Sequence, residues 1–337
     1  MKKLLKYGLT VFVTCVAFLS LSACGSNDTA KKAFASDYLA LTKTKDNSQE
    51  ISLDLTKIKA TGSGAAAINQ FAGSKATIKA SMDTANKIAS LSATIAASGK
   101  NYKIDLLMSE SGLYIASDDI KALYNDSDIN SLLTGSADAT TKQAYDALIS
   151  SLTAPYLLID AKTLNQGLSS SDETWEDTVD EMFVASKSTI SESDVAKALK
   201  DAPVSAFTQK GDKTAFKAPL GSSYFLNFIK VLASANANLT ASQTNKMMRS
   251  LKDSDAQADL KKITAEMSLN KKTHEAAVNI AGKISEKSKD SLDFQMKMNS
   301  KSSKLEEEIQ LPAADQAQTL EEVQNAAISV LFAGQVS

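Results

Sequence analysis

The sequence has few of the side chains that carry redox, metal and nucleophilic chemistry. Its 337 residues include two cysteines, Cys15 and Cys24, and one histidine, His274. Metal sites built from histidine and cysteine need more ligands than these, and a Ser-His-Asp triad needs a histidine beside a recognisable nucleophile. His274 lies among charged residues in an expected turn, and we expect it at the surface. The composition therefore predicts a protein without enzymatic activity, cofactor or metal.

Motifs of common enzyme and nucleic-acid-binding classes are also missing. The stretch Thr61–Gly64 is rich in glycine, but it lacks the Lys-Ser/Thr pair that a phosphate-binding loop requires. The Gly-x-Ser-x-Gly motif does not occur. Arg249 is the single arginine among 37 basic residues, which nearly excludes bidentate arginine clamps for phosphate. Charges of both signs are interspersed, so we expect no nucleic acid partner.

Long apolar runs are absent, apart from a short one near the N-terminus. Residues 9–21 are apolar except for two threonines and one serine, and they follow Lys2, Lys3 and Lys6. A membrane span needs about 20 apolar residues, so this run is too short to cross comfortably. A positive segment followed by a short apolar core is typical of a secretory signal peptide.

A cysteine follows small residues directly after this run. Leu21-Ser22-Ala23-Cys24 resembles the lipobox of bacterial lipoproteins, in which the cysteine thiol receives a diacylglycerol and the signal is cut just before it. The resemblance implies a signal peptide over residues 1–23, and a mature chain tied to the membrane by diacylglyceryl-Cys24. Two acyl chains give stable attachment, whereas one gives only marginal binding. Two alternatives are an uncleaved anchor in which Cys24 has no role, and release of Val16–Ala23 as a signalling peptide.

Cleavage before Cys24 would change what the chain can do. Cys15 and three lysines would leave with the signal, so 34 basic residues would face 39 acidic ones. One remaining cysteine excludes an intramolecular disulfide. Residues 24–36 would hold the lipidated cysteine and a small, polar tether. We therefore expect the protein on the extracytoplasmic face of the cell membrane.

Alternating apolar and polar residues between Lys75 and Ala116 predict a meander of four antiparallel strands. Turns are expected at residues 84–86, 98–101 and 110–112. The apolar positions are Ala76, Ile78, Ala80 and Met82, then Ala89, Leu91, Ala93 and Ile95, then Tyr102, Ile104, Leu106 and Met108, then Leu113, Tyr114 and Ile115. One face of this sheet should therefore be apolar.

A second meander is expected in the C-terminal half. Its apolar positions are Ile263, Ala265, Met267 and Leu269, then Ala276, Val278 and Ile280, then Leu292, Phe294, Met296 and Met298, then Leu305, Ile309 and Leu311. Ile78 and Ile263 are 185 positions apart, and several residues around them recur at the same offset. We interpret the pattern as two related halves, at about 50–170 and 190–335. Two unrelated amphipathic meanders could also look alike, since alternation is easily satisfied.

Helices and short strands are expected around the meanders. A strand is expected over residues 51–55, another over 156–160 and a hairpin around Gly211, with helices near residues 145–152 and 225–232. Thr319 and Glu322 form a capping box that opens a C-terminal helix. The fold class is therefore α+β: a large curved antiparallel sheet, a half-barrel or open barrel, with helices on its apolar face. Residues 37–337 should form a single domain.

Two groups of residues could bind something. The acidic residues around Trp175 (Asp172, Glu173, Glu176, Asp177, Asp180 and Glu181) could attract a cation, but the order of ligands in a calcium loop is missing, so a solvated helix face is the better interpretation. The soft apolar face of the sheet could instead hold a hydrophobic ligand. Its candidate residues are Met82, Leu106, Met108, Met267, Phe294, Met296 and Met298. The same residues could also be ordinary core beneath the helices.

The lipobox, tether, two meanders and intervening helices together resemble the LolA/LppX-like superfamily of lipoprotein carriers, in its Gram-positive form. Residues 112–115 and 156–160 are similar to short strands typical of that group. The resemblance implies a half-barrel whose concave face holds a lipid or another hydrophobic ligand, and it implies no catalytic residue.

We therefore expect a membrane-anchored, non-enzymatic protein that binds or carries such a ligand. One alternative is a structural lipoprotein that docks an envelope protein partner without any ligand cavity. Another is the solute receptor of an ABC importer, which would need repeated βαβ units.

Overall fold

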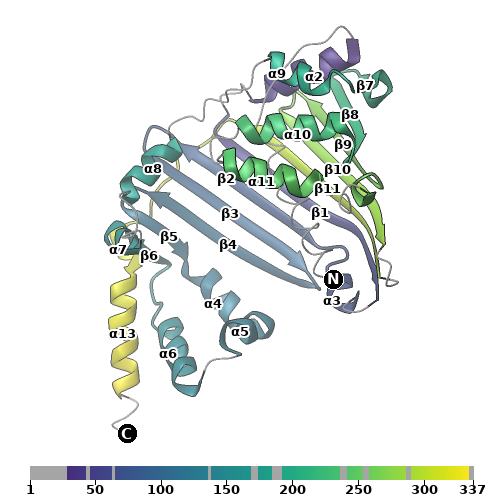
Figure 1. Ribbon diagram of the computed structural model, residues 1–337. Coiled ribbons are helices and arrows are strands. Elements are labelled where there is room, and N and C mark those ends of the chain that lie inside the picture. Colours follow the sequence, from purple (N-terminus) through teal and green to yellow (C-terminus); the bar gives the residue numbers. More distant parts are fainter. Residues whose placement is uncertain are drawn as a thin grey trace. The chain divides into compact units, whose positions relative to one another are not determined.

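The computed structural model describes residues 29–42, 46–62, 65–135, 138–167, 174–183, 192–235, 241–252, 258–285 and 290–333. Within these ranges the chain is α+β, with one large open sheet of 12 strands and helices beside it (Figure 1). This confirms the predicted fold class. The strands are β1 (Ser48–Thr61), β2 (Lys75–Asp83), β3 (Ile88–Ala97), β4 (Lys100–Ser109), β5 (Gly112–Ala116), β6 (Tyr156–Asp160), β7 (Phe207–Lys210), β8 (Lys213–Pro219), β9 (Ile263–Asn270), β10 (Glu275–Ser285), β11 (Ser291–Ser303) and β12 (Ala317–Thr319).

The helices fall between the strands. They are α2 (Thr29–Thr42), α3 (Ala65–Asn69), α4 (Ser117–Asn125), α5 (Ser127–Thr134), α6 (Ala139–Ser150), α7 (Ala161–Gly167), α8 (Trp175–Phe183), α9 (Glu192–Leu199), α10 (Ser223–Ala235), α11 (Ala241–Lys252) and α13 (Leu320–Ala333), with 3-10 turns η1 (Val204–Ala206) and η2 (Ala314–Gln316). The strand order is β12-β6-β5-β4-β3-β2-β1-β11-β10-β9-β8-β7. Pairing is antiparallel except between β6 and β12 among the pairs described.

The chain divides into two compact units, and neither is one continuous stretch. Unit 1 comprises residues 1–76, 96–99 and 186–304, and unit 2 comprises residues 77–95, 100–185 and 305–337. The sequence suggested consecutive halves at about 50–170 and 190–335. The units cut across these halves, because β1 pairs with β11 and β12 pairs with β6.

Unit 1 has a covered core. Five apolar residues lie opposite one another across five strands: Phe216, Met267, Val278, Met298 and Leu53. The first four are at most 4% exposed, and they belong to one cluster with side chains from α2, α9, α10 and α11. Figure 1 shows α10 and α11 lying over these strands. Helices therefore pack on the apolar face here, as the sequence predicted.

The first described helix, α2, is held by this core. Phe34 is fully buried, and its ring centre lies 5.6 Å from that of Phe216 and 5.8 Å from that of Phe207. The hydroxyl of Thr214 donates to Asp37 at 2.9 Å, and Lys271 pairs with the same carboxylate at 2.8 Å. A tether over residues 24–36 was expected, and this is wrong from Thr29 onward, since the segment is helical and packed.

Unit 2 consists of a meander and several helices. Carboxylate side chains accept hydrogen bonds from backbone N–H groups at the N-termini of most of these helices. The predicted strands between Lys75 and Ala116 are present as β2 to β5. Five helices have an acidic residue at their start, where the first backbone N–H groups need acceptors. The residues are Asp126 for α5, Asp138 for α6, Asp160 for α7, Asp177 with Thr174 for α8, and Glu322 with Thr319 for α13. The last pair is the predicted capping box.

The first turns of the two meanders have the same geometry. Asp83 accepts from the backbone N–H groups of residues 85 and 86, and Asn270 accepts from those of residues 272 and 273. Each turn ends in a residue with positive φ, Lys87 at 51° and His274 at 54°. These turns correspond at an offset of 187 rather than 185. A shift of two residues keeps every side chain on the same face.

The second meander is shorter than predicted. Its strands β9, β10 and β11 occur where expected, but the closing strand through Leu305, Ile309 and Leu311 does not form. Residues 304–313 have no regular structure, and the chain then enters β12, which pairs with β6 of unit 2. Alternation alone cannot specify a strand whose partner edge is already occupied.

Candidate functional site

The best-defined candidate from the sequence lies outside the described residues. Cys24 and the signal segment at 1–23 belong to residues 1–28, so lipidation stays a prediction. No helix that the structure describes is long and apolar enough to span a membrane.

The apolar face of β2, β3 and β4 is the candidate site within the described residues, and we call it the open face. All of its members except Ala76 belong to unit 2. Its members are Ala76, Ile78, Ala80 and Met82 of β2, Ala89, Leu91, Ala93 and Ile95 of β3, and Tyr102, Ile104, Leu106 and Met108 of β4. None of them is buried. Ile78, Leu91 and Ile95 are 38%, 37% and 47% exposed, which is high for large apolar residues on a sheet.

The predicted ligand residues divide between two environments. Met82, Leu106 and Met108 are half-buried members of the open face. Met267, Met296 and Met298 are 4%, 7% and 2% exposed within the covered core of unit 1, and Phe294 packs against that core. These last four residues form packing beneath helices, so the structure does not place them on an open surface.

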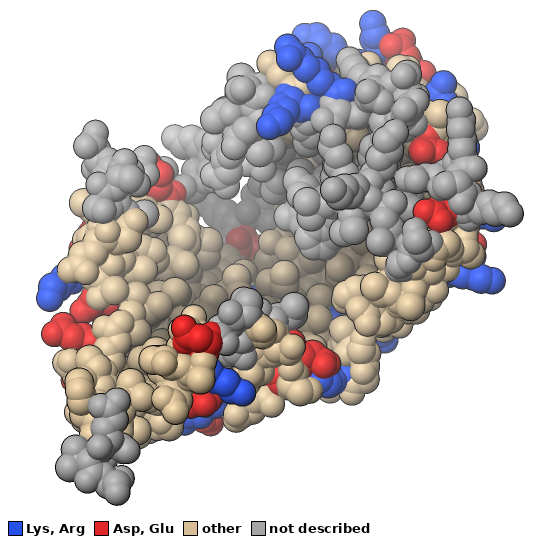
Figure 2. Space-filling model, turned by 60° about the horizontal axis from the view of Figure 1, so that its bottom comes forward, with Lys and Arg blue, Asp and Glu red and all other residues tan. Residues whose placement is uncertain are grey.

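The members of the open face are apolar apart from the hydroxyl of Tyr102. Most charged residues of β2 and β4 occupy the opposite parity positions, but Lys100 at the start of β4 has the parity of the open face and pairs with Asp126 and Asp128. In Figure 2, uncharged residues in tan make up most of the described surface in view, and charged side chains lie mainly along its margins. Such a surface can bind by excluding water, and within it the hydroxyl of Tyr102 is the one side-chain group that can donate or accept a hydrogen bond among the members named above.

Helix α8 is fastened to the turns of the unit 2 meander. The indole N–H of Trp175 donates to the carbonyl of Ser109 at 2.9 Å, and Trp175 is 8% exposed. Lys87 lies between Asp180 and Glu110, at 2.5 Å from each, and its hydrogen bonds to these carboxylates hold its pKa above the ordinary value. Asp180 of the acidic cluster therefore joins α8 to the turn between β2 and β3, whereas Asp172 and Glu173 lie outside the described residues. Among the described residues, no group of three or more His, Cys, Asp or Glu could hold a metal ion.

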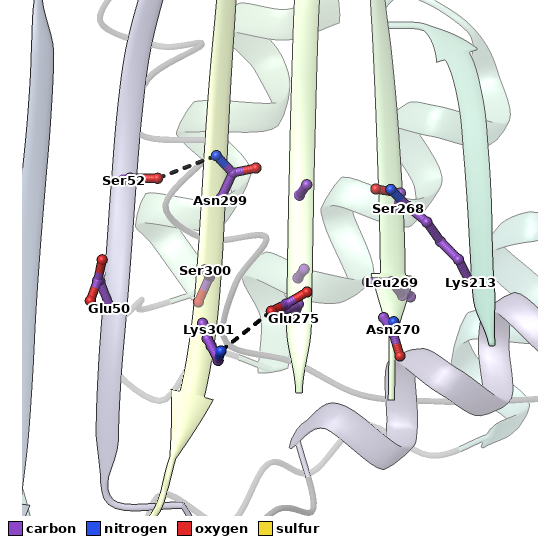
Figure 3. A pocket seen from close by; sticks show the side chains of 12 residues that line it. Glu50, Ser52, Lys213, Ser268, Leu269, Asn270, Glu275, Asn299, Ser300 and Lys301 are labelled. Carbon is purple, nitrogen blue, oxygen red and sulfur yellow. Dashed lines mark hydrogen bonds and ion pairs between the residues drawn. The ribbon is translucent and has the colours of Figure 1, made fainter. Parts of the chain in front are cut away.

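A polar trough crosses the outer face of unit 1, opposite the core. Its cavity has a volume of about 570 Å³. Glu50, Lys301, Glu275, Asn270 and Lys213 lie opposite one another across five strands, and a row of smaller residues runs beside them (Figure 3). Lys301 and Glu275 pair at 3.6 Å. The trough could not be predicted from the sequence, because the register of five paired strands, and not a motif, brings these residues together. Its alternating charges are those of a cross-strand ladder.

The lone histidine is structural. His274 lies in the turn between β9 and β10, where its Nδ1 is 2.5 Å from Asp46. The Asp46 side chain is 4% exposed, while His274 is 37% exposed. The pair ties the β9–β10 turn to the segment between α2 and β1.

The comparisons with protein-family models, curated proteins and solved structures found no match for this chain.

Proposed function

We propose that the protein is a non-enzymatic lipoprotein, anchored through diacylglyceryl-Cys24 to the extracytoplasmic face of the cell membrane, which binds a lipid or another hydrophobic ligand on the open face. The difference in coverage between two similar meanders carries the proposal. In unit 1 the apolar face is sealed by helices, whereas every member of the open face in unit 2 stays at least partly exposed.

The dimensions of the open face suit an acyl chain. Ala76 and Met82 are six residues apart on one strand, which corresponds to about 20 Å. One leaflet of membrane hydrocarbon is about 15 Å thick, so an extended acyl chain fits along the strands. Burying ten methylenes would contribute about 8 kcal/mol, which before the costs of ordering corresponds to a Kd on the order of micromolar.

The side chains of the open face also suit an adaptable ligand. Met82 and Met108 are flexible and polarisable. The alanines of the open face have small side chains, so they leave shallow depressions between the larger residues. We also propose that the protein is related to the LolA/LppX-like carriers that its sequence resembles. The features that support it are the lipobox and the antiparallel sheet with helices on its apolar side in unit 1.

The proposal is tested with one substitution on each side of a single strand. Leu91→Lys places a charge on the open face, and Thr94→Lys places the same charge on the opposite, exposed face of β3. The chain beginning at Gly25, which contains every described residue, is purified from bacteria and weighed by native mass spectrometry.

We expect a lipid to co-purify with the parent chain and with Thr94→Lys, and to be lost from Leu91→Lys. A fluorescent fatty acid should likewise be taken up by the parent chain and by Thr94→Lys, but not by Leu91→Lys. A parent chain that carries no lipid and takes up no fatty acid would contradict the proposal.

A second candidate is an envelope protein that docks a partner. The end of α13 favours it, since Ile328, Val330 and Phe332 are 51%, 53% and 65% exposed. Crosslinking in the envelope, with Phe332→Ser as the variant, would test this surface. The importer receptor is not favoured, because β6 with β12 is the one parallel pair among the described pairings.

A further inference from the structure

The start of α2 lies very near the proposed lipid anchor. Five residue steps separate Cys24 from Thr29, the first residue of α2, and an extended chain of this length reaches at most about 18 Å. The polar layer of a bilayer is about 5–8 Å thick on each side. If Cys24 carries the lipid, as the proposed function holds, the surface around Thr29 lies at or just above the headgroups.

The surface next to Thr29 is fixed by a buried lysine. Lys31 is 7% exposed, and its ammonium donates to the carbonyls of Lys200 at 3.1 Å and Ala202 at 3.2 Å. It also lies 5.7 Å from the ring centre of Phe207. These contacts hold the end of α9 and the start of η1 beside the first turn of α2.

The side chains on this surface are basic and apolar. Lys32 on α2 and Lys197 and Lys200 at the end of α9 are exposed, and Val204 is 61% exposed. Lys200 directly follows α9, and its backbone N–H donates to the carbonyl of Lys197 at 3.4 Å. Asp201 is an exposed carboxylate in the same region, and Asp194 is half-buried. We call Lys32, Lys197, Lys200 and Val204 the basal patch.

We infer that the basal patch rests on the anionic headgroups of the membrane that holds the anchor. The inference rests on the proposed lipidation of Cys24, and it adds an orientation for unit 1 that the ligand proposal does not contain. A lysine near an anionic surface contributes about 1 kcal/mol, within a screening length of about 8–10 Å. Tethering makes such weak contacts effective, because the patch cannot diffuse away.

The mature chain allows a direct test because Cys24 is its one cysteine. The chain beginning at Cys24 is coupled through this thiol to a maleimide lipid, in vesicles of phosphatidylglycerol and phosphatidylcholine. Acetylation of each lysine is then measured by mass spectrometry for the free and the coupled protein. Lys59, Lys283 and Lys297, exposed on the outer face of unit 1, serve as internal controls.

We expect the reactivity of the three basal lysines to fall several-fold relative to the controls on anionic vesicles. The effect should be smaller on phosphatidylcholine alone. A flexible linker of about 20 Gly and Ser residues inserted before Thr29 should restore the reactivity at high salt.

Equal protection of basal and control lysines would overturn the inference, and so would equal protection on neutral and anionic vesicles. Chemical coupling makes the result independent of lipidation in cells and of any ligand on the open face. Failure here is therefore distinguishable from failure of the proposed function.

Discussion

The same substitution should destabilise the protein to very different extents at two methionines. Met298 is 2% exposed in the covered core, so Met298→Lys buries a charge and should cost more than about 4 kcal/mol of unfolding free energy. Met108 is half-buried on the open face, where a lysine can extend to water, so Met108→Lys should cost about 1 kcal/mol. Urea unfolding of the two variants measures the difference. Equal losses would mean that the open face is packed as tightly as the core.

The sequence could not separate these two methionines. Both lie at apolar positions of regular alternation, each within a predicted strand. What distinguishes them is a cover of helices, and Phe34, Leu199 and Phe228 supply it from segments remote from β11 in the chain. Alternation fixes which face a side chain occupies, but it carries no information on what lies above that face.

The carboxylates that begin the helices of unit 2 should make those helices sensitive to acid. The backbone N–H of Thr141 donates to Asp138 at 2.7 Å and, with the Thr141 hydroxyl, lowers the pKa of this carboxyl. Hydrogen bonds from Thr163 and Thr319 lower the pKa values of Asp160 and Glu322 in the same way. A lowered pKa stabilises the fold above the ordinary value of about 4, and this contribution disappears as the pH falls through the lowered pKa.

We therefore expect unit 2 to lose stability between pH 5 and pH 2, and Asp138→Asn to lessen that loss. Asparagine can still accept at the start of α6, but it does not titrate. Urea unfolding at pH 7 and at low pH measures both effects. An unchanged pH dependence in Asp138→Asn would show that this residue does not contribute.

The sequence predicted helices and strands correctly where apolar residues recur at a regular helical or strand spacing. The meander of unit 2, β6, the hairpin of β7 and β8, α6, α10 and the capping box of α13 all occur where the patterns indicated. Helix α2 was missed, although Ala30, Phe34 and Tyr38 recur every four residues. The small and polar residues after Cys24 favoured a tether over residues 24–36, and this segment includes the first half of the helix. The predicted strand through Ile309 does not form for a different reason. Glu307 interrupts the alternation there, and both edges of β11 are already paired, with β1 and with β10.

The single tryptophan allows one unit to be followed by itself. Trp175 lies in unit 2, so its fluorescence reports that unit, whereas far-UV circular dichroism reports both. Phe34→Ala removes a fully buried ring from unit 1 and should cost about 3–5 kcal/mol there. We expect the circular dichroism transition to shift to lower urea and to separate from the fluorescence transition.

A matched control uses the same change at the surface. Phe71 is 46% exposed, so Phe71→Ala should leave both transitions within about 0.5 kcal/mol of the parent. Transitions that move together in Phe34→Ala would show that the two units unfold as one.

The pairing of β1 with β11 sets an order of events during biosynthesis. Ser48 lies opposite Ser303, so a strand near the start of the chain stays without this partner until almost the whole chain has emerged. The pairing of β12 with β6 likewise awaits residues 317–319. Contacts this remote in sequence make folding slow, because a long loop must close before they form. A chain with these pairings therefore completes neither unit until nearly all of it has been synthesised.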